Sequence, residues 1–252
     1  MEKKQYHKLR EVEDAHWWFR SLNELAAGWI RDAGTPDRPR VLDAGCGTGG
    51  LLALLSEFSD VEGVDASEAA VALARARGIA TVRRDDLNAP TFERESYDAA
   101  TCVDVLYHRG IQDDALALRH IVAALRPGGI LFLHLPAYDW LRSRHDDRVH
   151  GARRYRLGDV RTLLAGAGLE PVHASYRYAP LLPSIALWRL VSAPFRSTGA
   201  PPGESSSDVG RVPAIVNLPL LWMCRLENRI SRRWTLPFGS SVYGVGRKPA
   251  RP

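Results

Sequence analysis

Residues 40–55, RVLDAGCGTGGLLALL, carry glycines at a spacing that is typical of a loop binding a nucleoside cofactor. A short apolar run ends at the glycines and leucines at helical spacing follow, which predicts a strand, a tight loop and a helix. Glycines let the backbone turn sharply and approach a ligand, and the following helix presents its N-terminus to that ligand. This stretch is the first candidate for the chemistry of the protein.

The glycines fit two patterns that point to different cofactors. Gly45, Gly47 and Gly50 read G-x-G-x-x-G, which is the pattern of a nicotinamide-dependent oxidoreductase. Read from Asp43, the loop is D-x-G-x-G-x-G, which is a nucleoside-binding loop of another kind. Both patterns want an acid for the ribose hydroxyls about 20 residues further on, and Asp65 serves either. The loop by itself leaves both alternatives open.

Short apolar segments alternate with helical segments along the chain from this loop. Strands are expected at 41–45, 61–65, 79–87, 96–108, 130–137, in the second half of 157–178 and at 240–248, and helices at 51–58, 68–78, 112–129 and the start of 157–178. This alternation predicts an α/β fold with a doubly wound, mostly parallel, Rossmann-like sheet of seven strands. Ligands bind such sheets at the carboxyl ends of the strands, which brings the glycine loop and residues 102–108 together.

The expected domain boundaries follow from where the alternation of strands and helices begins and ends. We expect an N-terminal helical lid at 1–35, a cofactor-binding core at 36–178, and the last strand and tail at 241–252. Residues 179–240 are expected to form a helical insertion or cap, with a flexible Gly/Pro/Ser-rich linker at 197–210.

Three later features favour the second reading of the loop. Asp43 precedes the glycines, the acids Asp85 and Asp86 follow the third strand, and LRPGG introduces the fifth strand. In the order VLDAGCGTG, GVDAS, RRDDL, YDAATCVDVLYH and LRPGGILFL, residues 40–178 resemble the class I S-adenosylmethionine-dependent methyltransferases. In an oxidoreductase, Asp43 and the pair Asp85 and Asp86 would have no functional role.

The resemblance implies where the methionine end of S-adenosylmethionine would lie. Gly45, Cys46 and Gly47 would pass under it. Asp43 would organise the loop and face the amino group of the cofactor, and Val103 would border the methionine moiety.

The resemblance likewise implies the nucleoside end of the site. Asp65 would hold the ribose hydroxyls and Ala66 would pack on the adenine. Asp85 or Asp86, together with Leu87, would reach the adenine edge, and the sequence leaves the choice between the two acids open.

Methyl transfer to a hydroxyl needs an aligned nucleophile and is helped by a general base, for which histidine is the usual candidate. His108 follows the fourth strand, and His145 and His150 lie in the loop 144–155 after the fifth strand. These three are the candidate bases. His7, His120, His134 and His173 lie in helix and strand patterns and are interpreted as structural.

Aromatic and basic residues near the same edge are candidates for contact with the methyl acceptor. Trp17 and Trp18 lie in the segment HWWF, which cannot turn all its apolar area inward on one helix and is interpreted as part of the lid. Tyr107 stands where many relatives carry an acid, and Arg154 and Tyr155 end the loop after the fifth strand. HWWF, the histidine-rich loop and LPFGSS together resemble a bacterial subgroup of these methyltransferases that act on small molecules.

Composition limits the other classes. The three cysteines are far apart and no compact cluster of acids is present, so neither a zinc site nor a catalytic metal is predicted. No base-flipping motif or RNA-binding module argues for a nucleic-acid substrate. No signal peptide or run of 18 apolar residues is found, so a cytoplasmic protein is expected.

Positive charge is concentrated at the C-terminal end, with ten Lys/Arg against three Asp/Glu from Ala179 onward in a chain whose net charge is +5. The insertion 179–240 has three readings: a cap on the acceptor pocket, a homodimer interface, or peripheral contact with the inner face of a membrane. The sequence thus predicts an S-adenosylmethionine-dependent methyltransferase that acts on a small-molecule acceptor, with oxygen as the expected acceptor atom. A non-catalytic S-adenosylmethionine-binding protein is the alternative, and an NAD(P)-dependent oxidoreductase a weaker one.

Overall fold

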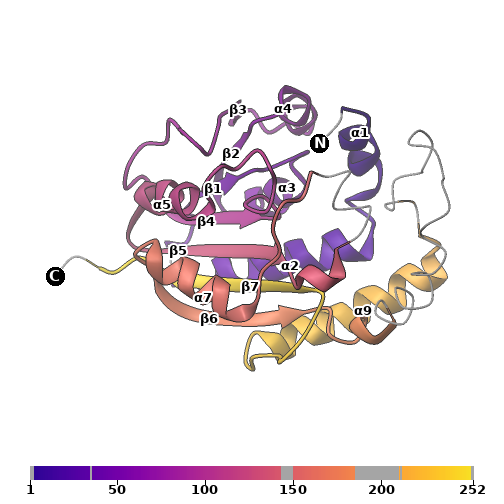
Figure 1. Cartoon of the computed structure of the whole chain (residues 1–252). Coiled ribbons are helices and arrows are strands. Elements are labelled where there is room, and N and C mark those ends of the chain that lie inside the picture. The colour runs from indigo at the N-terminus through magenta and orange to yellow at the C-terminus, as the bar shows by residue number, and fades with distance from the viewer. Residues whose placement is uncertain (1–2, 35, 143–149, 185–209, 211, 251–252) are drawn as a thin grey trace.

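A computed structural model describes residues 3–34, 36–142, 150–184, 210 and 212–250 of the chain (Figure 1). The linker expected at 197–210 falls outside these residues except for Gly210, and so does the candidate base His145. Most of the Pro-bracketed first part of the insertion is also outside them.

One sheet of seven strands runs through the centre of the molecule. The strands are β1 (Arg40–Ala44), β2 (Asp60–Asp65), β3 (Val82–Arg84), β4 (Tyr97–Val103), β5 (Leu125–Pro136), β6 (Glu170–Arg177) and β7 (Ser241–Arg247). They lie in the order β3-β2-β1-β4-β5-β7-β6, and β7 is antiparallel to both of its neighbours while the other pairs are parallel. The predicted doubly wound, mostly parallel sheet is confirmed.

Helices cover both faces of the sheet, as Figure 1 shows. They are α1 (Lys3–Val12), α2 (Trp17–Arg31), α3 (Gly50–Ser56), α4 (Glu68–Arg75), α5 (Asp114–Ala124), α7 (Leu157–Gly166) and α9 (Ala214–Ser231). Residues of α2 and α3 share one apolar cluster with one face of the central strands, whereas residues of α5 and α7 share another with the opposite face.

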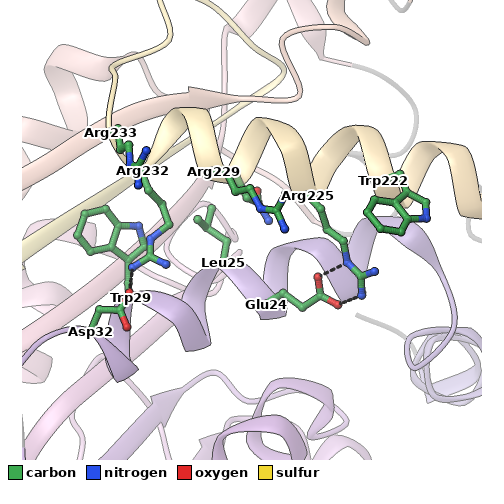
Figure 2. Close-up of a pocket in the computed structure, with 10 residues that line it drawn as sticks. Glu24, Leu25, Trp29, Asp32, Trp222, Arg225, Arg229, Arg232 and Arg233 are labelled. Atoms are coloured by element: carbon green, nitrogen blue, oxygen red, sulfur yellow. Dashed lines mark hydrogen bonds and ion pairs between the residues drawn. The ribbon is translucent and has the colours of Figure 1, made fainter.

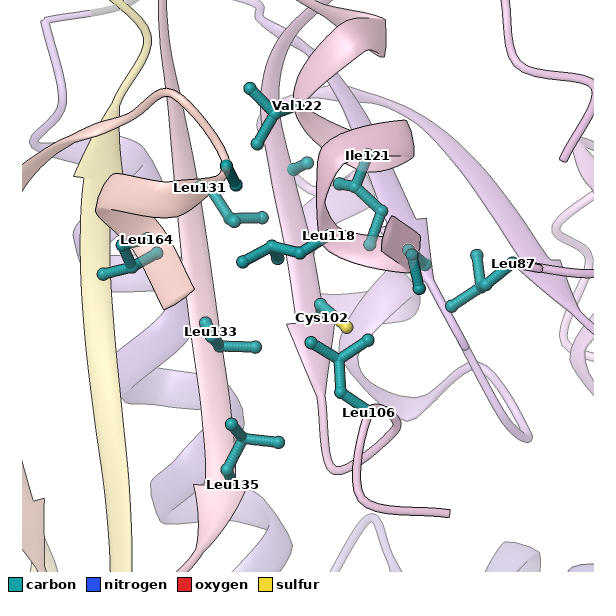
Figure 3. Packing of buried hydrophobic residues seen from close by; sticks show 14 of the residues in the cluster. Leu87, Cys102, Leu106, Leu118, Ile121, Val122, Leu131, Leu133, Leu135 and Leu164 are labelled. Carbon is teal, nitrogen blue, oxygen red and sulfur yellow. The ribbon is translucent and has the colours of Figure 1, made fainter. Parts of the chain in front are cut away.

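The alternation of side chains along β5 explains how one strand serves both clusters. Ile130 and Phe132 belong to the cluster under α2, and Leu131, Leu133 and Leu135 belong to the cluster under α5 and α7. Successive side chains of a strand point to opposite faces, so a continuous apolar run is what a strand covered on both sides requires. Figure 3 shows the three leucines of β5 on the side of the sheet that carries Leu118 and Ile121 of α5.

The helix expected over 112–129 ends earlier than its pattern indicates. α5 stops at Ala124, and β5 already begins at Leu125, which pairs with Tyr97 of β4. Gly128 then adopts a φ of 81°, its amide donates to the carbonyl of Lys248, and the Lys248 amide donates to the carbonyl of Gly129. Pairing with neighbouring chain segments, which the local pattern does not contain, therefore sets this boundary.

The described half of the insertion is the long helix α9, which lies along α2. Arg225 of α9 binds both carboxylate oxygens of Glu24 at 2.6 and 2.8 Å, and Asn228 donates to the carbonyl of Ser21 at 2.7 Å. At the other end of α9, Asn217 accepts from the amide of Trp17 and donates to the carbonyl of Ala15, both at 2.9 Å. The insertion thus holds the segment that joins α1 to α2. No helix in the described part of the chain is long and apolar enough to cross a membrane.

Candidate functional site

The glycine loop joins β1 to α3 at the carboxyl edge of the sheet, where ligands bind in folds of this kind. Gly45 has a φ of 90°, and its amide and that of Cys46 donate to the carbonyl of Val64 at 2.8 and 2.9 Å. A Cβ at Gly45 would lie 2.2 Å from a methyl group of Val105. Glycine is therefore required here both by the backbone angle and by the close approach of the loop after β4.

Asp65 at the end of β2 fastens this loop to the next one. Its two carboxylate oxygens accept from the amides of Gly47 at 3.0 Å and Ser67 at 2.8 Å. Burial raises the pKa of this carboxyl, whereas the two amides and the charge of His108 lower it. Asp65 thus lies where the resemblance implies a contact with ribose hydroxyls, and it also shapes the loop that would hold them.

Asp43 is a buried acid directly beneath the loop. Its side chain is 2% exposed and accepts from the hydroxyl of Thr101 at 2.7 Å. Its pKa is raised to about 7, chiefly by burial; the Thr101 hydroxyl opposes the rise and the charge of Asp65 adds to it. A cationic group of a ligand placed near Asp43 would favour the charged form of this carboxyl.

Cys46 contributes backbone and packing. It is 7% exposed, it lies in an apolar cluster with Leu52 and Val71, and burial raises the pKa of its thiol well above the usual range. The thiol therefore stays protonated, and the predicted contribution of Cys46 to the loop is that of its main chain.

Asp85 and Asp86, between which the sequence leaves the choice open, differ in their hydrogen bonds. Asp85 accepts from the amides of Asp86 and Thr91, from the Thr91 hydroxyl and from Arg83, and these bonds lower its pKa despite partial burial. Asp86 is exposed, and one of its oxygens accepts from the amide and side chain of Asn88 at 2.9 and 2.7 Å. Asp85 is thus occupied by the turn, and Asp86 retains an oxygen for which the described residues offer no hydrogen bond.

The remaining predicted cofactor residues surround the same edge. Ala66 is exposed beside Asp65, and Val103 is half-buried at the end of β4. Leu87 is 5% exposed, and its carbonyl contacts Nδ1 of His120 at 3.1 Å, which gives that histidine the structural part expected of it.

An ion-pair network that the sequence did not reveal ties the N-terminal segment to the glycine loop. Glu13 is buried and accepts from the Thr48 hydroxyl and from Arg77, whose guanidinium also binds Asp14 at 2.8 Å and the carbonyl of Thr48 at 2.7 Å. A Cβ at Gly50 would lie 2.6 Å from the Glu13 carboxylate. No periodic pattern marks this contact, because its partners are 35 to 64 residues apart.

Helix α1 approaches the nucleoside side of the site through Tyr6. The ring is 9% exposed, and burial raises the pKa of its hydroxyl to about 12, with the nearby charge of Asp65 contributing. The hydroxyl also interacts with the side chain of Ser67. The leading helix thus lies against the acid that would hold the ribose.

The HWWF segment stacks on the end of β6. Trp18 lies face to face with Tyr178 at 3.9 Å between ring centroids, and Trp17 meets the same ring edge-on at 5.8 Å. His16 accepts the Trp18 amide at 3.2 Å as the N-cap of α2. The two tryptophans are half-buried.

Tyr107 and His108 follow β4 and stack on each other at 4.3 Å. Tyr107 is 9% exposed and its carbonyl accepts from the Ala152 amide at 2.7 Å, whereas His108 is half-exposed. His108 is close enough to Asp65 for its charge to lower the pKa of that acid. It therefore lies near the predicted cofactor.

Residues 150–155, the described end of the loop after β5, are held mainly by contacts within the protein. Tyr155 is 5% exposed and its hydroxyl donates to Asp114 at 2.7 Å, which makes it a packing residue and gives no support to a substrate contact. Arg154 donates to the carbonyl of Ala137 at 2.7 Å. His150 is exposed with a φ of 56°, and its carbonyl accepts from Arg109 at 2.8 Å.

Three further residues meet at the carboxyl edge. His134 of β5 is fully buried, and its ring nitrogens contact Asp104 at 3.0 Å and Ser241 at 2.9 Å. His173 is held in the same structural way by the carbonyl of Ser231 at 2.6 Å. Sequence reasoning placed His134 in the core, but it did not reveal its two partners, which lie 30 and 107 residues away.

A cavity of about 770 Å³ lies between α2 and α9 and is separate from the glycine loop (Figure 2). Its walls include Trp29 and Trp222 together with Arg225, Arg229 and Arg232. Within the described ranges, no group of three or more His, Cys, Asp or Glu side chains is placed to hold a metal ion.

Taken together, the strand order, the glycine loop and the acids within β1, at the end of β2 and after β3 define a class I methyltransferase. Residues 14–174 match the model of a family described as a methyltransferase domain, and this is more than half of the chain. The protein belongs to this methyltransferase family. The prediction of a methyltransferase of the S-adenosylmethionine-dependent class is therefore confirmed, and the oxidoreductase reading of the glycine loop is set aside.

Curated relatives match part of the chain. The ubiquinone biosynthesis O-methyltransferases of Bordetella bronchiseptica and Paraburkholderia phymatum are each 33% identical to it, over 135 and 144 residues. The matches cover 47% and 50% of this chain and 55% and 61% of those proteins. The chain thus spans little more than half the length of the curated relatives it matches.

Solved structures share the fold across most of the chain. Phosphoethanolamine N-methyltransferase 2 of Haemonchus contortus, solved in complex with S-adenosyl-L-methionine, has a TM-score of 0.56 and 19% identity, covering 92% of this chain and 53% of that one. The cyclase SpnF has a TM-score of 0.57 and 19% identity, with 93% and 84% covered. At such identities the likeness establishes the fold, and the fold alone does not fix the reaction. The narrower resemblance carried by HWWF stays a prediction.

Proposed function

We propose that this protein transfers the methyl group of S-adenosylmethionine to a hydroxyl oxygen of a small-molecule acceptor. The observation that carries the proposal is the loop site of Asp43, Gly45 and Asp65 in a chain of the methyltransferase family. Relatives whose names specify O-methylation favour oxygen over nitrogen or carbon as the acceptor atom. Bound there, S-adenosylmethionine would supply an activated methyl group on a sulfonium centre.

The residues of the site fit the parts of this cofactor. A buried carboxyl with a pKa raised to about 7 suits Asp43 to a cationic amino group, because the cation restores the charged form. The oxygens of Asp65 already accept from amide donors and suit ribose hydroxyls. Asp86, with an oxygen not engaged by the described residues, is the better of the two acids for the adenine amino group.

The acceptor would lie beyond the methionine end of the cofactor, near the half-buried Trp17 and Trp18 and near Tyr107 and His108 after β4. Aromatic walls of this kind favour a planar, largely apolar acceptor such as a phenol. Positioning supplies most of the rate in a displacement at carbon, and a base assists when the acceptor is a hydroxyl.

Calorimetric titration tests the cofactor half of the proposal. S-adenosylmethionine and S-adenosylhomocysteine should bind to the wild type in the micromolar range, and Asp65→Ala should weaken both by at least tenfold. Asp60→Ala, a change of an exposed acid on the same strand, is the matched control and should bind normally. Binding of NADH with silence towards both sulfur ligands would overturn the proposal.

Incubation with a panel of phenols, amines and carboxylic acids tests the acceptor half. We expect S-adenosylhomocysteine release only with phenols, and mass spectrometry should locate the added methyl on oxygen. Methylation of amines alone would replace the O-methyl proposal with an N-methyl one. Cofactor binding without turnover of any compound would support the non-catalytic alternative.

We also propose that helix α9 lies on an anionic lipid surface, where an apolar acceptor would be found. Exposed apolar side chains recur along one side of the helix, at Ile215, Leu218, Trp222, Leu226 and Ile230. Arg229 and Arg233 are exposed near this row, whereas Arg225 and Arg232 are paired with Glu24 and Asp32. A helix with an apolar row bordered by cations suits the interface of a negatively charged bilayer.

Sedimentation with vesicles tests this surface. Vesicles containing phosphatidylglycerol should carry the protein down, and pure phosphatidylcholine vesicles should carry much less. Trp222→Ser with Leu226→Ser should abolish the difference, whereas Leu116→Ser, another exposed apolar residue, should not. Loss of a solution dimer in the double variant, with no vesicle binding by the wild type, would assign the row to a homodimer interface instead.

A further inference from the structure

Three polar side chains form a continuous hydrogen-bonded row that runs from the core to the carboxyl edge of the sheet. Ser241 Oγ lies 2.9 Å from Nε2 of His134, and Nδ1 of His134 lies 3.0 Å from Oδ1 of Asp104. Ser241 is 2% exposed and His134 is fully buried, whereas the Asp104 side chain is 32% exposed. Only the carboxylate end of the row reaches the surface of the site.

The backbone at the end of β4 directs Asp104 into this row. Val103 pairs with His134 across β4 and β5, and the Asp104 amide then donates to the carbonyl of His134 at 3.0 Å. Asp104 has a φ of 54°, a left-handed conformation that aspartate and asparagine tolerate better than most residues. The turn brings the side chain back over the neighbouring strand.

The row has one consistent direction of donation when Asp104 is charged. A carboxylate can only accept, so Nδ1 of His134 carries the proton and donates to it. In the neutral ring Nε2 is then an acceptor, and the hydroxyl of Ser241 donates to it. The histidine ring is thereby fixed in tautomer and orientation, and it holds one oxygen of Asp104 in place.

The Asp104 side chain is partly exposed, and the contact with His134 engages one of its two oxygens. No hydrogen bond to the other oxygen is made by any residue within the described part of the chain. The next residue, Val105, packs on Gly45 of the cofactor loop. On the other side lies Tyr178, whose pKa is raised by burial and also by the charge of Asp104, and on whose ring Trp18 stacks. Asp104 thus lies between the cofactor loop and the HWWF segment.

We propose that Asp104 is the catalytic base of the methyl transfer, with His134 and Ser241 as the residues that position it. This assignment rests on the proposed O-methyl transfer and names a base that is not among the candidate histidines. In the step, the acceptor oxygen forms a bond to the methyl carbon while the bond from that carbon to sulfur breaks. The hydroxyl proton passes to the free oxygen of Asp104, and later to water.

Substitution of Asp104 distinguishes a catalytic role of this residue from a purely structural role. Asp104→Asn keeps the size and the preferred backbone angle but cannot take a proton. With a catechol of ordinary acidity we expect turnover to fall at least 100-fold, while S-adenosylmethionine binds as before. With a nitrocatechol that is already ionised at neutral pH, the loss should be less than about fivefold, since no proton remains to be removed.

The positioning residues are tested by a matched pair. His134→Asn retains an amide donor near the place of Nδ1, and His134→Leu retains none. With the catechol, we expect the turnover rate of the asparagine variant to be at least tenfold higher than that of the leucine variant. The KM for the catechol should change little in both. Ser241→Ala should reduce turnover by less than either change of His134, because it acts one bond further from the base.

The outcomes distinguish the two proposals. Turnover by the wild type with equal losses for both phenols in Asp104→Asn, or with no loss, would overturn the assignment of the base and leave the O-methyl transfer intact. Cofactor binding by the wild type with no turnover of either phenol would overturn the proposed acceptor class, and the base assignment would fall with it. A larger loss with the catechol than with the nitrocatechol supports both.

Discussion

At the scale of single residues, the proposed cofactor site contains acids whose surroundings set their charge. Asp43 is buried below the glycine loop, and its pKa is raised to about 7, so much of it is neutral near and below pH 7 when no ligand is bound. Asp65 is partly satisfied by two amides, and Asp85 is fully engaged by the turn after β3. The three acids therefore have different parts despite similar positions at the ends of strands.

The raised pKa of Asp43 predicts how cofactor binding depends on pH. A cationic ligand group favours the charged form, so binding below pH 7 must release the proton of Asp43. Affinity for S-adenosylhomocysteine should rise by up to about tenfold per pH unit below 7 and level off above it. The same raised pKa makes the ligand-free protein less stable as pH increases towards 7, since the charged form is disfavoured in the folded state.

Calorimetry in two buffers of different ionisation enthalpy measures the protons released. We expect close to one proton at pH 6 and almost none at pH 8, and Asp43→Asn should remove the difference. An unchanged release in this variant would show that another group titrates. Asp60→Asn, which changes an exposed acid, serves as the control.

The choice between Asp85 and Asp86 gives a second prediction at this scale. Asp86→Asn should weaken S-adenosylmethionine binding about tenfold by removing an acceptor for the adenine amino group, with the melting temperature unchanged. Asp85→Asn should lower the melting temperature instead, because its carboxylate holds Arg83 and the Thr91 amide together. Comparison of affinity with melting temperature in both variants checks the assignment, and the reverse pattern would contradict it.

At the scale of elements, a buried ion pair connects the N-terminal segment to the glycine loop. The side chains of Glu13 and Arg77 are each 7% exposed and form an ion pair, and both also bind Thr48 of the glycine loop. Burial raises the pKa of Glu13, and the charge and hydrogen bonds of Arg77 oppose that rise. Each partner thus depends on the other.

Removal of one partner should cost more than removal of both. Arg77→Met leaves Glu13 buried without its cation and should lower the free energy of unfolding by about 3 kcal/mol. The double variant with Glu13→Gln should recover part of this loss, since no buried charge remains. Urea denaturation measures all four corners of the cycle, and strict additivity would contradict the coupling. Arg38→Met, in an exposed pair with Asp60, should have little effect.

At the scale of the whole molecule, β6, α2 and α9 meet around one buried cation. Arg177 at the end of β6 is fully buried, and it donates to Asn228 of α9 at 3.1 Å, to Ser21 of α2 at 2.8 Å and to the Tyr178 hydroxyl. The chain passes Arg177 again before β7, where a Cβ at Gly239 would lie 2.2 Å from the Arg177 carbonyl oxygen. Segments from both ends of the sequence thus pack around Arg177.

Gly239→Ala tests how closely the chain before β7 must approach the backbone of Arg177. The obstruction is backbone, which cannot rotate away, so we expect a loss of about 3 kcal/mol in the free energy of unfolding. Gly110→Ala is the matched control, because its added Cβ would meet nothing within 4 Å. Midpoints of urea denaturation compare the two, and a small loss at Gly239 would mean that the LPFGSS segment can shift.

The sequence by itself determined the elements whose signal is local. The glycine loop and Asp65 were predictable because strand, turn and helix patterns complete themselves within a few residues, and the order of these patterns fixed the class of sheet. Only the tertiary structure decided that Asp85 is engaged by the turn after β3 and that Tyr155 is buried. It alone joined Asp104, His134 and Ser241, because the pairing of β4, β5 and β7 brings together residues up to 137 positions apart. Contacts of that range leave no periodic trace in a single sequence, since they depend on which strands become neighbours.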